Sequence, residues 1–97
     1  MALLSLVTAP DIQQRLADSV RLLRKTKKLS RKALAEMSTV PEPTIKKFET
    51  TGQISLRQFL LLWQSVADLG SFVDLAKQAE DKLIQSQPRS INDVLRS

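Results

Sequence analysis

Residues 29–49, LSRKALAEMSTVPEPTIKKFE, contain the pattern that decides the fold. Ser30 can cap a helix, because its side-chain oxygen accepts a free backbone N–H of the first turn. The helical pattern then breaks before Pro41, whose ring disfavours a helical conformation at the preceding residue. A second helix can begin at Glu42, since the proline that follows lies in the first turn, where its missing N–H costs nothing. The stretch predicts two short helices joined by a tight turn, a helix-turn-helix.

The apolar residues of these two helices fall on one side, which we expect to be buried. Leu34, Ala35 and Met37 form the inward face of the first helix. Ile45 and Phe48 lie three residues apart in the second helix and therefore face the same way. The outward face of the second helix is then formed by Glu42, Thr44, Lys46 and Lys47.

Three further helices complete an all-α fold of five helices in a chain of 97 residues, a length that suits one domain. Apolar residues at helical spacing predict helices over residues 11–27, 56–69 and 71–84. The predicted organisation is an N-terminal arm (1–10), a five-helix domain (11–85) and a short C-terminal tail (86–97).

The helix predicted over residues 56–69 is apolar nearly all round, which is more than one core face needs. Two interpretations stay open. All of these residues belong to the core of one chain, or the spare face meets a second subunit. In the second case the dimer interface consists of Phe59, Leu62, Trp63 and Val66.

Composition excludes several classes of function. The chain has no cysteine and no histidine, so it lacks thiolate and imidazole ligands, a thiol nucleophile and the commonest general base. We therefore expect no enzyme, no catalytic residues, no metal and no cofactor. The apolar run near the N-terminus has no preceding basic region and is too short to span a bilayer, so we expect a cytoplasmic protein without membrane contact.

The positive charge is concentrated in the first part of the chain. Residues 1–60 contain 11 Lys or Arg and 5 Asp or Glu, a net charge of +6, whereas residues 61–97 have a net charge of −1. The basic charge thus surrounds the two-helix stretch. This asymmetry favours a polyanionic partner over a merely solvated surface.

The order of motifs resembles the Xre/Cro-type (phage-repressor-like) helix-turn-helix family. The resemblance spans about half of the chain, residues 20–69. Residues 48–62, FETTGQISLRQFLLL, and residues 88–95, PRSINDVL, resemble HipB-type antitoxins in particular. The motifs that carry the family resemblance are Leu23-Arg24-Lys25, Leu29-Ser30, Leu34-Ala35, Val40, Thr44-Ile45, Glu49 and Gly52.

The resemblance implies a compact repressor-like domain that binds double-stranded operator DNA as a homodimer and represses its own operon. It also implies that the protein neutralises a HipA-like kinase toxin. Base contacts are then expected from Glu42, Thr44, Lys46 and Lys47. Phosphate contacts are expected from Ser30, Arg31, Lys32, Thr50 and Arg57, because cations and the free N–H groups of a helix start bind phosphate oxygens.

The chain departs from the family pattern in the turn and at the start of the second helix. Ser38 and Thr39 stand where the family usually has a small residue and a glycine, and Pro41 replaces the usual Ser or Thr cap. Two alternatives stay open, and these departures support the second of them. One is a stand-alone phage-type regulator without a toxin partner, and the other is a protein-interaction module that does not bind DNA.

Overall fold

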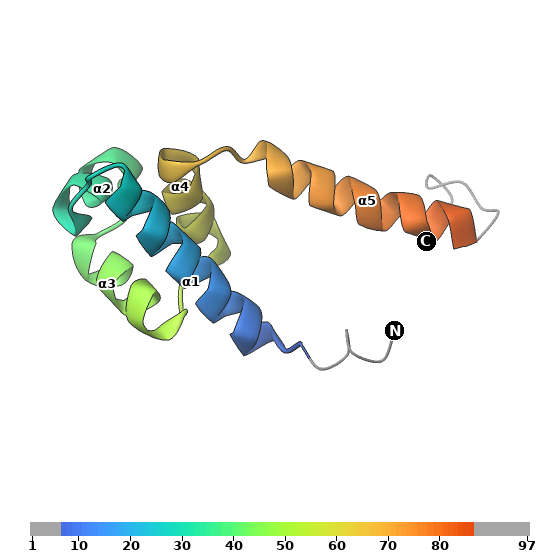
Figure 1. Ribbon diagram of the computed structural model, residues 1–97, viewed down its shortest axis with the longest axis horizontal. Helices are drawn as coiled ribbons and strands as arrows, with labels where there is room; N and C mark the ends of the chain where they lie inside the picture. Colours follow the sequence, from blue (N-terminus) through green and yellow to red (C-terminus); the bar gives the residue numbers. More distant parts are fainter. Residues whose placement is uncertain (1–6, 87–97) are drawn as a thin grey trace.

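The computed structural model describes residues 7–86, which form five α-helices and no strand (Figure 1). The all-α prediction is confirmed. The predicted arm and tail lie largely outside the described residues. The helices are α1 (Ala9–Thr26), α2 (Arg31–Ser38), α3 (Glu42–Thr51), α4 (Leu56–Val66) and α5 (Gly70–Ser86).

Hydrogen bonds between neighbouring residues set the helix starts. The side-chain oxygens of Thr8, Ser30 and Ser55 each accept a backbone N–H three residues further on. At α1 the bond is reciprocated, since the backbone N–H of Thr8 donates to the Asp11 carboxylate at 3.1 Å and thereby lowers the pKa of that carboxyl. The predicted caps at Ser30 and Ser55 are confirmed.

Two helices end at a residue in the left-handed conformation. Gly52 follows α3 with φ 78°, a conformation that glycine adopts without a steric penalty. Thr39 follows α2 with φ 65°, where a β-branched side chain is strained. The turn thus takes the shape that suits glycine although the chain has threonine there.

The first four helices, residues 9–66, form the four-helix unit. In it α3 and α4 each pack against both α1 and α2. Met37 was predicted to face inward but is 55% exposed, because the core side of α2 is centred on Leu34 and Ser38, one turn apart. The core consists of Ala17, Val20, Leu34, Val40, Ile45, Phe48, Phe59, Leu62 and Val66.

α4 is shorter than predicted and mostly belongs to this core. Phe59, Leu62 and Val66 are buried within the chain itself, which favours the core over a dimer interface for these three residues. Trp63 is half-buried, and its indole N–H donates to the backbone oxygen of Asp68 at 3.1 Å. Only Trp63 of the four predicted interface residues keeps accessible surface of any size.

α5 projects away from the four-helix unit (Figure 1). Its first turn is anchored by Phe72, whose ring centroid lies 5.7 Å from that of Phe59 and 5.3 Å from that of Trp63. Residues 73–85 are all exposed. Among residues 7–86, none of the helices combines the length and apolar character that crossing a membrane requires.

Candidate nucleic-acid interface

A buried carboxylate joins α1, α2 and α3. Glu49 accepts hydrogen bonds from Arg24 Nε at 2.8 Å and Nη2 at 3.0 Å, and from Arg31 Nε at 3.1 Å. Arg24 also donates from Nη1 to the backbone oxygen of Leu29 at 2.8 Å, which ties the turn before α2 to the same network. Two of the three charges are deeply buried, at 7% exposure for Arg24 and 5% for Glu49.

The surroundings of Glu49 favour its charged form. Burial by itself raises the pKa of this carboxyl, but the hydrogen bonds and charges of Arg24 and Arg31 outweigh it and hold the pKa below its ordinary value. One carboxylate faces two guanidinium groups, so the network keeps a net positive charge. Arg31 is its outer member, with 32% of its side chain exposed.

The exposed face of α3 lies opposite its buried one. Ile45, Phe48 and Glu49 face the interior, while Lys46 and Lys47 are exposed. Of the four predicted base-contact residues, Glu42, Lys46 and Lys47 are exposed and Thr44 is half-buried, so all four retain surface.

Two shallow hollows flank this face of α3 and share Pro43. The first, with a volume of about 410 Å³, lies between the starts of α2 and α3 and is lined by Arg31, Glu42, Pro43 and Lys46. The second, about 370 Å³, lies towards α4 and is lined by Pro43, Thr44, Lys47, Gln53, Ile54 and Gln58. The structure therefore divides the predicted base-contact residues between two sides of α3.

The predicted phosphate-contact residues are more scattered. The Ser30 side chain already accepts the N–H of Ala33, and Thr50 Oγ1 donates to the backbone oxygen of Lys46 at 2.8 Å. Lys32 and Arg57 are exposed. Of the five predicted phosphate-contact residues, Arg31 alone lines one of these two hollows, and Thr50 lies one helical turn after Lys46 on α3.

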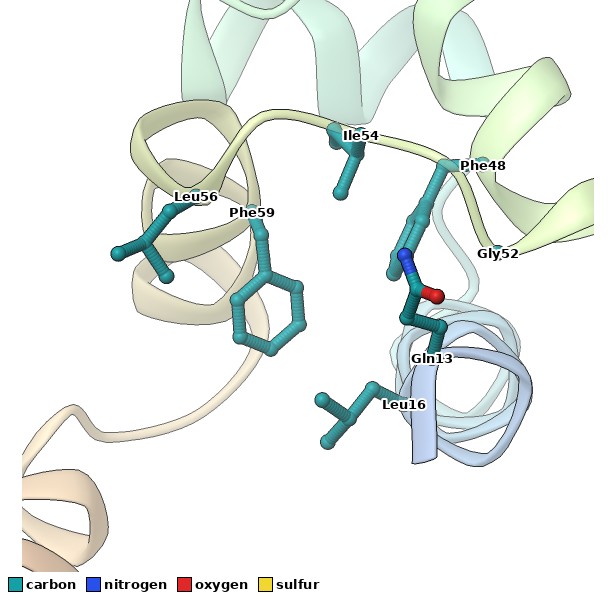
Figure 2. A pocket seen from close by; sticks show the side chains of 7 residues that line it. All are labelled: Gln13, Leu16, Phe48, Gly52, Ile54, Leu56 and Phe59. Atoms are coloured by element: carbon teal, nitrogen blue, oxygen red, sulfur yellow. The ribbon is translucent and has the colours of Figure 1, made fainter. Parts of the chain in front are cut away.

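A third hollow, of about 210 Å³, is apolar and lies between α1, the end of α3 and the start of α4. Figure 2 shows Leu16, Phe48 and Phe59 pointing into this space from three helices. At Gly52 a Cβ atom would lie 3.1 Å from the backbone carbonyl carbon of Gln13, so a larger residue there would push α1 away. We attribute to this hollow a role in packing, because it carries no charged side chain.

Sequence reasoning missed two features of this region. The first is the ion pair of Arg24 and Glu49, although each residue lies four positions after a predicted inward residue, Val20 and Ile45 respectively. The second is Gln58 beside Thr44 and Lys47. Its signal was the capping pattern from Ser55 to Gln58, which fixes this residue in the first turn of α4. The only signal of the ion pair in the sequence was the helical spacing that places Arg24 and Glu49 on the inward faces of their helices.

Residues 7–86 contain no group of three or more acidic, cysteine or histidine side chains arranged to hold a metal ion. No protein-family model, no curated protein and no solved structure matches this chain.

Proposed function

We propose that the protein is a sequence-specific DNA-binding repressor that acts as a homodimer, with α3 entering the major groove. One observation carries the proposal. α3 exposes two adjacent lysines on one face, while its opposite face is locked into the core by Ile45, Phe48 and the charged network at Glu49. A helix held rigidly on one side and basic on the other suits insertion into a groove lined by phosphates.

The base-reading role falls to the exposed face of α3. Lys46 and Lys47 can donate to the guanine acceptors O6 and N7. Glu42 can accept from a cytosine amino group, and Thr44 can contact a thymine methyl group. Because the two hollows place Lys46 with Glu42 and Lys47 with Thr44, we expect the two pairs to read neighbouring base pairs.

The phosphate-binding role falls to α2. Lys32 is exposed in its first turn, and Arg31 bonds Glu49 through Nε, so its Nη groups can donate to a phosphate oxygen. The free backbone N–H groups at the start of α2 and the positive end of its helix dipole also favour a phosphate at this place. The net charge of +6 over residues 1–60 adds a general attraction to DNA.

The finer proposal is that the repressor is also an antitoxin, which controls its own operon and neutralises a HipA-like kinase toxin. Its support is the resemblance of residues 48–62 and 88–95 to HipB-type antitoxins. Copurification with the product of the adjacent gene tests it. A protein that binds its own upstream DNA but no neighbouring gene product is a stand-alone regulator.

The first experiment is a mobility shift on DNA upstream of the protein's own gene, with competitor DNA and a series of salt concentrations. We expect a specific complex with a steep salt dependence. Lys47→Glu should weaken it by at least about tenfold, whereas Lys77→Glu, the same charge change on the distant helix α5, should have little effect. Equal binding by both variants, or no specific complex at all, would contradict the proposal.

One observation favours a protein-interaction module instead. Glu42 is exposed in the first turn of α3, where it would repel a nearby phosphate. Replacing Lys46 and Lys47 together with Glu separates the two readings. A protein-interaction module would keep its partner binding, and repression of the operon in cells would not change.

A further inference from the structure

Arg31 is held by a hydrogen bond at one edge of its guanidinium group. Its Nε donates to Glu49 Oε1 at 3.1 Å, and 32% of the side chain stays exposed. Within residues 7–86 its two Nη atoms form no hydrogen bond. The group is planar and its N–H donors form a rigid fork, so the bond at Nε also sets the direction of the free Nη edge. That edge offers two parallel N–H groups, the arrangement that binds two oxygens of one phosphate.

The carboxylate that holds Arg31 is itself held from another side. Glu49 Oε2 accepts from Arg24 Nε at 2.8 Å, and Oε1 accepts from Arg24 Nη2 at 3.0 Å. Arg24 also donates from Nη1 to the backbone oxygen of Leu29 at 2.8 Å. Because only 1% of the Glu49 side chain is exposed, water does not compete for these bonds. The carboxylate cannot turn without breaking charge-assisted hydrogen bonds, so Arg31 is bonded to a fixed point.

The network connects the start of α2 with the helix assigned to base reading. Arg31 is the first residue of α2, and Glu49 lies in the last turn of α3. Arg31 also lines one hollow together with Glu42, Pro43 and Lys46 of α3. Its side chain therefore lies beside the face of α3 that is proposed to enter the groove.

We propose that Glu49 is a positioning residue for DNA recognition. It holds the guanidinium of Arg31 so that a DNA phosphate bound at the two Nη atoms lies at a set place relative to α3. This inference rests on the proposed function and adds to it a connection between the phosphate contact and the base contacts. A phosphate contact carries no sequence information by itself but fixes the register of the protein on the duplex. A rigid anchor of this kind determines which base pairs Lys46 and Lys47 face.

Lys32, the next residue of α2, provides the contrast. It is exposed, and among the described residues it takes part in no ion pair. Its charge stands on a flexible stem and attracts phosphates from many directions. We expect Lys32 to contribute equally to the affinity for any DNA, and Arg31 to contribute more to the complex with the operator.

Arg31→Lys tests the proposal, because it keeps the charge and removes the fork. A lysine has one nitrogen at its tip, so it cannot bond Glu49 at one edge and offer two parallel N–H groups at another. The affinity for the DNA upstream of the protein's own gene should fall about threefold to tenfold relative to that for an unrelated duplex of the same length. The affinity for the unrelated duplex and its salt slope should stay the same, since the charge is unchanged. Arg21→Lys, the same exchange at an exposed site on α1, is the matched control and should leave both affinities as they are.

A double-mutant cycle separates positioning from a general effect on the fold. In a Glu49→Gln chain Arg31 has lost its fixed, charged acceptor. Arg31→Lys should then change the ratio of the two affinities by no more than about twofold. The variants are compared at a temperature at which circular dichroism shows that each is folded. An equal loss in both backgrounds, or no loss in the wild-type background, would overturn the proposal.

NMR of the arginine side chains in the free protein gives a second measurement, which needs neither DNA nor a folded Glu49 variant. The Nε–H of Arg31 should be ordered, like that of Arg24, whereas the Nε–H of the exposed Arg21 should be averaged by fast motion. An Arg31 Nε–H as mobile as that of Arg21 would contradict the positioning role.

Failure of this inference is distinguishable from failure of the proposed function. A wild-type chain that forms no specific complex with DNA refutes the repressor function, and the role of Glu49 with it. A specific complex whose preference for the operator is the same in Arg31→Lys refutes the positioning role alone.

Discussion

Replacing Glu49 with Gln removes a negative charge from the interior of the four-helix unit and hardly changes the shape of the side chain. In the wild type this carboxylate accepts three charge-assisted hydrogen bonds, at 2.8 and 3.0 Å from Arg24 and 3.1 Å from Arg31. The amide keeps one oxygen acceptor but turns an NH₂ donor towards a guanidinium. Arg24, only 7% exposed, is left with a buried positive charge and no counter-charge.

Breaking a buried ion pair by removing one partner costs about 3–5 kcal/mol. We expect the lower end, about 3 kcal/mol, because the amide oxygen retains one bond and Arg31 can turn its exposed side to water. In a domain of this size 1 kcal/mol shifts Tm by about 4–8 °C, so Tm should fall by about 12–24 °C.

Urea unfolding measures this loss, followed by circular dichroism and by the fluorescence of Trp63, the one tryptophan of the chain. Glu36→Gln is the matched control, since it makes the same charge change at an exposed site on α2 and should shift stability by no more than about 0.5 kcal/mol. If Glu49→Gln costs no more than this control, the network does not stabilise the fold, and apolar packing alone holds α3 in place.

Three further predictions concern acid stability, the turn and DNA recognition. Because the pKa of Glu49 lies below its ordinary value of 4.5 in the folded chain, its stabilisation is present above that pH and is lost as the pH falls through the folded value. Urea unfolding midpoints measured over a series of acid pH values should therefore fall more for the wild type than for Glu49→Gln. Parallel pH dependence of the two midpoints would contradict this. Thr39→Gly relieves the strain of the left-handed conformation and should raise the free energy of unfolding by about 0.5–1 kcal/mol. This value is the steric gain minus the cost of the greater freedom of glycine in the unfolded chain. A loss of stability would show that the contacts of the Thr39 side chain stabilise the fold by more than its strain costs. In DNA binding, Lys47→Ala should cost about 1–3 kcal/mol and relax specificity at one base pair, whereas Lys32→Ala should weaken all sequences alike and flatten the salt slope by about one unit. Altered sequence preference in the Lys32 variant would mean that the two roles are reversed.

The sequence by itself determined where α2, α3 and α4 begin and which face of α3 is apolar. The caps at Ser30 and Ser55 could be predicted because each bond joins groups three residues apart, within one turn of the chain. The end of α3 at Gly52 could be predicted for a similar reason, since only the local backbone conformation is involved. The inward direction of Ile45 and Phe48 follows from helical spacing alone.

Other features were decided only by the way the helices pack. Arg24 and Glu49 are 25 positions apart in the sequence, and nothing local to either marks it as buried and paired. The apolar residues of α4 could not be divided between the core and a subunit interface from the sequence. A helix that is apolar nearly all round has no polar face to indicate which side packs against the other helices. α4 packs against α1 and α2, and Phe59, Leu62 and Val66 are buried in the core, whereas Leu56 stays exposed at the start of the helix.

The turn shows the same division. Its position could be predicted from Pro41, but the left-handed conformation of Thr39 could not, since the local preference of threonine opposes it. Leu34 before the turn and Val40 after it are both buried in the core, and we attribute the strained conformation between them to this packing. Local hydrogen bonds are thus encoded by neighbouring residues, whereas burial, ion pairing and strain depend on contacts that exist only once the helices have packed.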